Sequence, residues 1–188
     1  MYEKGELTGL VKEYFPTGGL FRTSMYDDGD LQGTMTVFHR NGEKRYEIPY
    51  DDNKIEGTMT TFHENGIPKT VTDYKSDKKE GEHFEYYSNG QLESKIQYVD
   101  NDAQGGRASY YPTGQLKRTG QTDKNVAVGE WLSYFEDGTL KNETIYDDEG
   151  NLNGSVTDFD RDGKRHYQMI YKKGDIESYT YYNKAGEV

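Results

Sequence analysis

Apolar and polar residues alternate with a period of two in some segments of this chain. In segment 92–98, Leu92, Ile96 and Tyr98 stand an even number of residues apart, so they share one face of an extended strand. Segment 129–135, Gly-Glu-Trp-Leu-Ser-Tyr-Phe, is also rich in strand-forming residues. No window shows an apolar stripe with the period of a helix, so we predict strands and no substantial helix.

A pattern of 24 residues repeats along the chain. Each repeat begins with a glycine, continues with four residues, two mostly aromatic residues and a short turn ending in glycine, and places a tyrosine eight residues later. Thr122 takes the place of this late tyrosine in the fifth repeat. A fixed period in this range predicts a stacked array, in which no single repeat buries its own apolar face. The opening glycines Gly9, Gly33, Gly57, Gly81, Gly105 and Gly129 are 24 residues apart, and Gly154 follows after 25.

Each repeat is predicted to form a β-hairpin. Its turn contains Asn-Gly, Asp-Gly or Pro-Thr-Gly, and Asn-Gly and Asp-Gly favour tight hairpin turns because a positive φ costs these residues little. The predicted fold is all-β: an elongated, solenoid-like, single-domain array over residues 1–188, in which about seven hairpins form a twisted antiparallel sheet. Partial repeats near Tyr2 and after Tyr181 lead us to expect a piece of a longer chain, with any targeting segment upstream.

The composition identifies aromatic rings as the main source of burial. The 188 residues include 18 Tyr, 7 Phe, 1 Trp and no Cys, and the formal net charge is −11. Large rings bury about 150–250 Å² each, which offsets a low aliphatic content. The lack of Cys excludes a disulfide framework, thiol catalysis and Cys-ligated metals, and it suits either redox compartment. The sequence leaves the compartment open: we expect a cytoplasmic protein for the chain as sequenced, and an extracytoplasmic one if an upstream signal was removed.

Acidic pairs recur in the loops between repeats, at Asp27-Asp28, Asp51-Asp52 and Asp147-Asp148. One interpretation is solvated turn residues that also protect sheet edges from pairing. The other is a negative strip that steers a basic protein partner. The net negative charge argues against a nucleic-acid partner, because binding to its phosphate backbone requires basic patches.

Aromatic residues are the second candidate for a binding surface. Two successive residues of a strand point to opposite faces, so one aromatic residue of each pair faces outward unless the array covers it. Trp131 is the leading hot-spot candidate, because Trp and Tyr are enriched among hot spots; the alternative is a packing role. The candidate binding residues are Trp131, Tyr87, Tyr111, Phe135, Asp27, Asp28, Asp51 and Asp52.

Two further patterns match metal sites only in part. His39 and His63 occupy equivalent positions about 9.6 Å apart, and no third ligand repeats with them, so we expect an aromatic ladder instead. Segment 158–163 matches the first half of a calcium loop, but the twelfth position is Met169 rather than Glu. No phosphate loop, dinucleotide fingerprint or hydrolase motif occurs. We therefore expect no enzyme, no catalytic residue, no metal and no cofactor.

The repeat resembles the MORN-variant (MORN-2 type) repeat. The best-matching units are 81–92, Gly-Glu-His-Phe-Glu-Tyr-Tyr-Ser-Asn-Gly-Gln-Leu, and 129–140, Gly-Glu-Trp-Leu-Ser-Tyr-Phe-Glu-Asp-Gly-Thr-Leu. Departures are Thr122, and Lys44 and Pro68 where other repeats have Leu. Bacterial proteins with such repeats often look like antitoxins or immunity proteins. The related repeats of eukaryotes serve as scaffolds and have been linked to membrane lipids.

The resemblance implies a non-catalytic protein-binding module, most directly an antitoxin or immunity protein. We expect it to act as a monomer that neutralises a basic cognate toxin by occlusion, through a tyrosine-rich groove flanked by carboxylates. The alternative is a surface or scaffold repeat protein that tethers to a membrane, to a cell-wall polymer or to another copy of itself. An upstream signal peptide or lipid-attachment Cys favours this alternative.

Overall fold

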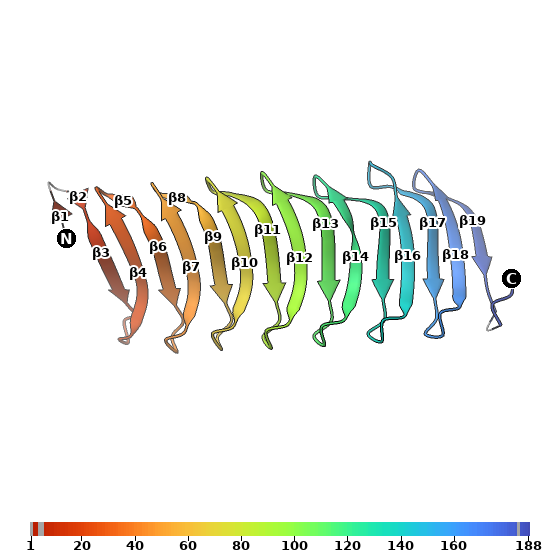
Figure 1. The fold of residues 1–188 in the computed structure, drawn as a ribbon, viewed down its shortest axis with the longest axis horizontal. Coiled ribbons are helices and arrows are strands. Elements are labelled where there is room, and N and C mark those ends of the chain that lie inside the picture. Colours follow the sequence, from red (N-terminus) through yellow and green to blue (C-terminus); the bar gives the residue numbers. More distant parts are fainter. Residues whose placement is uncertain (1, 4–5, 184) are drawn as a thin grey trace. The chain divides into compact units, whose positions relative to one another are not determined.

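The computed structural model describes residues 2–3, 6–183 and 185–188, and every regular element within them is a β-strand (Figure 1). This confirms the predicted all-β fold of antiparallel hairpin repeats. The partial repeats predicted at the two ends include residues 1, 4–5 and 184, which lie outside the described residues. In the described part, no helix is long and apolar enough to cross a membrane. The chain divides into two compact units: residues 1–91 with 98–101, and residues 92–97 with 102–188.

Unit 1 contains three complete hairpins whose strands pair with their neighbours in an antiparallel sheet. The short strands β5 and β8 extend the pairing at the loop edge, β1 pairs with β2, and β11 pairs with β10. The strands are β1 (Tyr2–Glu3), β2 (Glu6–Leu7), β3 (Gly9–Tyr14), β4 (Leu20–Asp27), β5 (Asp30–Leu31), β6 (Gly33–Phe38), β7 (Lys44–Asp51), β8 (Lys54–Ile55), β9 (Gly57–Phe62), β10 (Pro68–Lys75) and β11 (Lys78–Tyr86).

Unit 2 repeats this arrangement, and from β13 to β19 each strand pairs antiparallel with the next. Strand β12 (Leu92–Val99) has residues in both units. The other strands are β13 (Asp102–Tyr110), β14 (Leu116–Asp123), β15 (Val126–Tyr134), β16 (Leu140–Tyr146), β17 (Leu152–Phe159), β18 (Arg165–Lys172) and β19 (Asp175–Tyr181).

The predicted hairpin turns form at their glycines. Between β6 and β7, the Gly42 amide donates to the His39 carbonyl at 3.1 Å, and the His39 amide donates to the Glu43 carbonyl at 2.8 Å. Gly42 has a φ of +91°, a conformation that side chains disfavour. The Asn41 side chain accepts a hydrogen bond from the Glu43 amide at 3.0 Å. The local turn chemistry therefore fixes where each strand ends.

The loops at the other edge tie each hairpin to the next one. Asn53 has a left-handed φ of +64°, and its amide donates to the Leu31 carbonyl at 3.1 Å. Its side-chain oxygen accepts from the Leu31 amide at 2.8 Å. In unit 2, Asn125 makes the same two bonds with Ala103, at 3.0 and 2.8 Å. These loops therefore hold a defined conformation.

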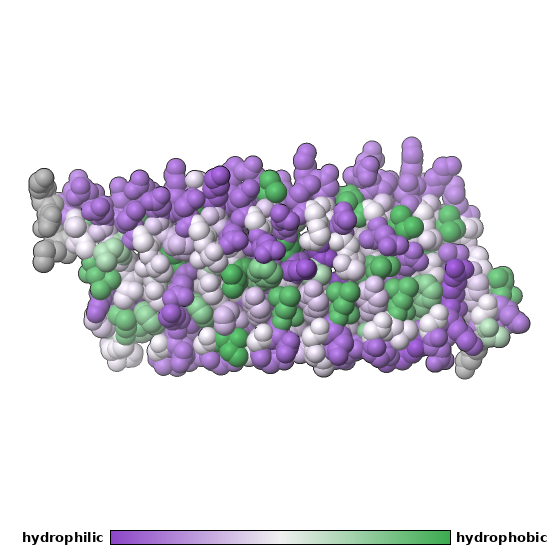
Figure 2. All heavy atoms as spheres, viewed as in Figure 1, coloured by the Kyte–Doolittle hydropathy of each residue, from purple (hydrophilic) through white to green (hydrophobic). Residues whose placement is uncertain are grey.

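Much of the core of each unit lies in a row of opposed residues on neighbouring strands, which we call the central row. Within it, Met35 is 9% exposed and Trp131 is 5% exposed. Unit 2 departs from this pattern, because Arg107 in the row is exposed and Ala103 and Ala108 outside it are buried. Figure 2 shows apolar residues in the middle of each unit and hydrophilic ones along the edges. In unit 1 the row contains Val11, Ser24, Met35, Ile48, Met59, Thr72 and His83. In unit 2 it contains Arg107, Gly120, Trp131, Thr144, Val156 and Met169.

Candidate functional site

Trp131 is held in a fixed position on β15. Its indole N–H donates to the Gln121 carbonyl at 3.1 Å, and the Arg118 guanidinium lies 4.5 Å from the ring centroid. The ring lies over Gly120, where an added Cβ would come within 2.2 Å of it. The packing role expected as the alternative for Trp131 is thus present, and the same residue also lines a hollow of unit 2.

The other three aromatic candidates are half-buried where strands end in turns. The Tyr111 hydroxyl donates to the Tyr134 carbonyl of the next hairpin at 2.8 Å. Phe135 is flanked by the Lys141 ammonium at 5.6 Å and the Arg161 guanidinium at 5.1 Å. Tyr111 lines the same hollow as Trp131, whereas Phe135 does not, and Tyr87 belongs to unit 1.

His39 and His63 link successive hairpins in the same way as Tyr111. The His39 ring donates to the Phe62 carbonyl at 3.3 Å, and the His63 ring donates to the Tyr86 carbonyl at 2.8 Å. The structure therefore favours the ladder interpretation for both residues. In the partial calcium motif, Asp160 caps a hairpin turn by accepting from the Asp162 amide at 3.0 Å. No group of three or more His, Asp or Glu side chains suited to a metal ion occurs among the described residues.

The four acidic candidates of unit 1 lie exposed at the last residues of β4 and β7 and at the first residues of the loops that follow. The Asp51 carboxylate accepts from the Gln32 side chain at 2.9 Å, and the Asp52 amide donates to the same side chain at 3.0 Å. Asp28 and Asp52 adopt left-handed φ values of +44° and +46°. We call this set the loop carboxylates: Asp27, Asp28, Asp51 and Asp52.

The third acidic pair lies in unit 2 and caps its own turn. The Asp147 carboxylate accepts from the amides of Glu149 at 3.1 Å and Asn151 at 2.8 Å. Partial desolvation acts to raise the pKa of Asp147, but these hydrogen bonds together lower the pKa below its usual value. Asp147 is therefore a structural turn residue, and Asp148 beside it is exposed.

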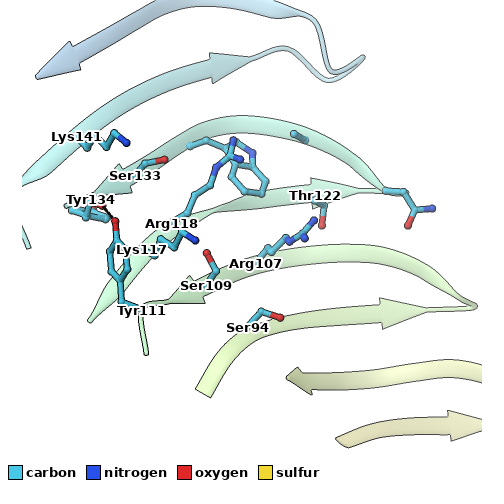
Figure 3. A pocket seen from close by; sticks show the side chains of 13 residues that line it. Ser94, Arg107, Ser109, Tyr111, Lys117, Arg118, Thr122, Ser133, Tyr134 and Lys141 are labelled. Atoms are coloured by element: carbon cyan, nitrogen blue, oxygen red, sulfur yellow. Dashed lines mark hydrogen bonds between the residues drawn. The ribbon is translucent and has the colours of Figure 1, made fainter. Parts of the chain in front are cut away.

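A hollow of about 500 Å³ lies on one face of unit 2, and we call it the basic hollow (Figure 3). Strands β12 to β16 and the turns between them supply its walls, and no carboxylate among the described residues lines it. Its cationic residues are Arg107, Lys117, Arg118 and Lys141. Its hydroxyl-bearing residues are Ser94, Ser109, Tyr111, Thr122, Ser133 and Tyr134, and Asn125, Ala127 and Trp131 complete the lining.

The hollow forms where the fifth repeat departs from the common pattern. Arg107 and Gly120 stand opposite each other in the central row, where unit 1 has pairs such as Met35 and Ile48. Thr122 replaces a large late tyrosine and pairs with Ala127, a small residue. Thr122 and Ala127 both line the hollow, and their small side chains leave the volume that opens it. The space over Gly120 is occupied by the Trp131 ring.

The sequence pattern predicts only part of this site. Trp131 and Tyr111 are among the predicted binding residues and Thr122 departs from the repeat, but the basic residues are not among the predictions. A signal was present: Lys117 and Arg118 are adjacent in an otherwise acidic chain. The face that a strand residue occupies becomes evident only once the register of β13, β14 and β15 is known.

Five segments match the model of the MORN repeat variant: residues 7–28, 31–52, 55–76, 79–100 and 127–151. Together they make up more than half of the chain. The unmatched stretch 101–126, between the fourth and fifth segments, contains Arg107, Lys117, Arg118 and Thr122, which line the basic hollow. A comparison with curated proteins found no match.

Proposed function

The chain belongs to the family of MORN repeat variants, and from this premise we propose that it is a non-catalytic protein-binding module that acts as an antitoxin or immunity protein. In this proposal it neutralises a basic cognate toxin by covering the toxin's active surface. Repeats of this family are generally binding repeats. A binding role therefore agrees both with the family and with a fold built of repeated β-hairpins.

The observation that best supports a basic partner is the set of loop carboxylates. All four are exposed, and two of them are tied to Gln32 in a fixed loop conformation. A preordered surface loses little conformational entropy on binding. With a net charge of −11, the chain also attracts a basic protein over a distance of about one Debye length, roughly 8–10 Å at moderate salt.

The test compares the wild-type protein with a variant that neutralises the loop carboxylates, D27N/D28N/D51N/D52N. Each protein is immobilised, exposed to lysate from its own source at low and at physiological salt, and the captured proteins are identified. We expect one stoichiometric basic protein on the wild type, and association with the variant slower by about tenfold because steering is lost. Expression of that partner alone should arrest growth, and co-expression with this chain should restore it.

A matched control removes the same amount of negative charge at the hairpin-turn edge. The variant E43Q/E64Q/E136Q/D162N changes four exposed residues there, and it should associate more nearly like the wild type. Equal association rates for both variants would contradict a role for the loop carboxylates. Capture of lipid, of wall polymer or of this chain itself, without a basic protein, would replace the inhibitor role by a scaffold role.

A further inference from the structure

We propose that the basic hollow of unit 2 binds a small ligand that carries two or more phosphate groups. This inference goes beyond the proposed protein-binding role and uses other residues. The chain has 34 acidic and 23 basic residues, yet among the described residues four cations and no carboxylate line this one hollow. Positive charge is therefore concentrated in this hollow, although the chain as a whole is acidic.

The cations of the hollow lack acidic partners. In the described part of the chain, none of Arg107, Lys117, Arg118 and Lys141 forms a salt bridge. Arg22 in unit 1 provides a direct comparison, because it occupies the repeat position of Arg118. Arg22 forms an ion pair with Glu13, which stands opposite it on β3, at 2.5 Å.

Serines stand on both sides of Arg118, and Ser109 takes the place of the carboxylate that faces Arg22. Ser109 on β13 and Ser133 on β15 are the directly opposed neighbours of Arg118. Figure 3 shows these side chains over the same part of the sheet. The positive charge of Arg118 is thus surrounded by neutral hydroxyl groups, which can donate to an anion as well.

Aromatic rings position the cations without neutralising them. Arg118 stacks over Trp131 at 4.5 Å, and the Lys117 ammonium lies 5.7 Å from the centroid of the Tyr111 ring. Stacking uses the face of a guanidinium and leaves its N–H edge available. That edge can bind two phosphate oxygens at once, which makes Arg the preferred residue for planar, bidentate recognition of phosphate.

The size and charge of the hollow indicate the class of ligand. Its volume of about 500 Å³ falls in the range of small-molecule sites. A phosphate monoester carries about −1.5 to −2 charges near neutral pH, so two phosphate groups balance the four cations. The lining is polar apart from the rings and Ala127, which disfavours an apolar ligand.

Calorimetric titration with inorganic pyrophosphate at constant ionic strength tests the proposal. We expect saturable one-to-one binding, accompanied by a change in the fluorescence of Trp131, the single tryptophan. The variant R107Q/R118Q should bind at least tenfold more weakly. The matched control R22Q, at the equivalent position of unit 1, should bind like the wild type. Circular dichroism and urea unfolding of every variant establish that it is folded.

A second variant removes the site without removing a cation. Ser109 occupies the repeat position of Glu13, so Ser109→Glu should recreate the ion pair that Glu13 makes with Arg22. We expect this variant to fold and to lose pyrophosphate binding by at least tenfold. Unchanged affinity in both S109E and R107Q/R118Q would overturn the assignment, as would a heat signal in the wild type that never saturates.

Two further titrations define the chemistry and its source. Citrate presents carboxylates instead of phosphates, and tighter binding of citrate than of pyrophosphate would overturn the phosphate assignment. Phosphate groups occur both on soluble molecules and on lipid headgroups. Flotation with phosphatidylcholine vesicles that contain phosphatidic acid distinguishes a headgroup source from a soluble ligand. It is carried out with the wild type and with R107Q/R118Q. Binding that R107Q/R118Q weakens, either to the vesicles or to pyrophosphate, supports the phosphate site.

Discussion

The glycine at position 120 determines how Trp131 is buried and where Arg118 lies. Gly120 lies beneath the Trp131 ring, so the indole occupies space that a side chain would fill in another repeat. The Arg118 guanidinium lies over the same ring, and the Gln121 carbonyl accepts a hydrogen bond from the indole N–H of Trp131. A single glycine thus allows Trp131 to become one of the four buried apolar side chains found among the described residues. The position of Trp131 in turn fixes Arg118 at the hollow.

Gly120→Ala should therefore destabilise the protein, whereas Gly106→Ala should not. An added Cβ at Gly120 would lie 2.2 Å from Trp131, but at Gly106 it would meet nothing within 4 Å. Neither glycine has a positive φ, so steric overlap is the main difference between them. We expect a loss of about 1–3 kcal/mol for G120A, and a change within about 0.5 kcal/mol for G106A. Urea unfolding followed by Trp131 fluorescence measures both, and equal midpoints would contradict this account of the ring.

At the scale of the strand and hairpin, the sequence was sufficient for most of the fold. Turn glycines such as Gly42 and Gly138 have positive φ values in the structure, as their Asn-Gly and Asp-Gly contexts predict. These signals are local, so one sequence contains them. The basic hollow is different, because Arg107 and Arg118 are brought together by strand pairing. The sequence predicted the elements, but not which irregular side chains would share a face.

The link between β10 and β11 should be sensitive to pH. His83 is buried, and its Nδ1 shares a hydrogen bond of 2.6 Å with the Thr72 hydroxyl. Burial, assisted by the nearby charge of Lys79 and opposed by Glu85, lowers the pKa of His83 below 6.5. The unfolded chain therefore binds this proton first, and the free energy of unfolding falls as pH decreases through about 6.5.

Thermal unfolding between about pH 7.5 and pH 5.5 checks this prediction. Over that interval the ordinary pKa of histidine lies inside the window and those of Asp and Glu lie below it. We expect the melting temperature of the wild type to fall, and that of His83→Gln to fall less, since Gln has no proton to gain. If the two proteins lose stability in parallel, His83 is not responsible for the pH dependence.

On the scale of the whole molecule, charge acts in two opposite ways. Net charge of −11 attracts a basic partner, but the same charge produces repulsion within the folded chain. The exposed loop carboxylates contribute to both effects, because they are close in sequence and face water. The exposed cations of the basic hollow reduce the repulsion locally. A function that depends on the acidic surface therefore reduces the stability of the fold.

Added salt should consequently stabilise the free protein while weakening its complex with a basic partner. Raising NaCl from about 0.01 M to about 0.15 M shortens the Debye length from about 30 Å to about 8 Å, which screens repulsion and steering alike. We expect the melting temperature to rise over this range, and to rise less in D27N/D28N/D51N/D52N, which has four fewer negative charges. A melting temperature that falls with salt would show that attractive ion pairs, such as Lys78 with Asp100, outweigh the repulsion. Because the two effects of salt have opposite signs, release of a partner by salt cannot then be attributed to unfolding.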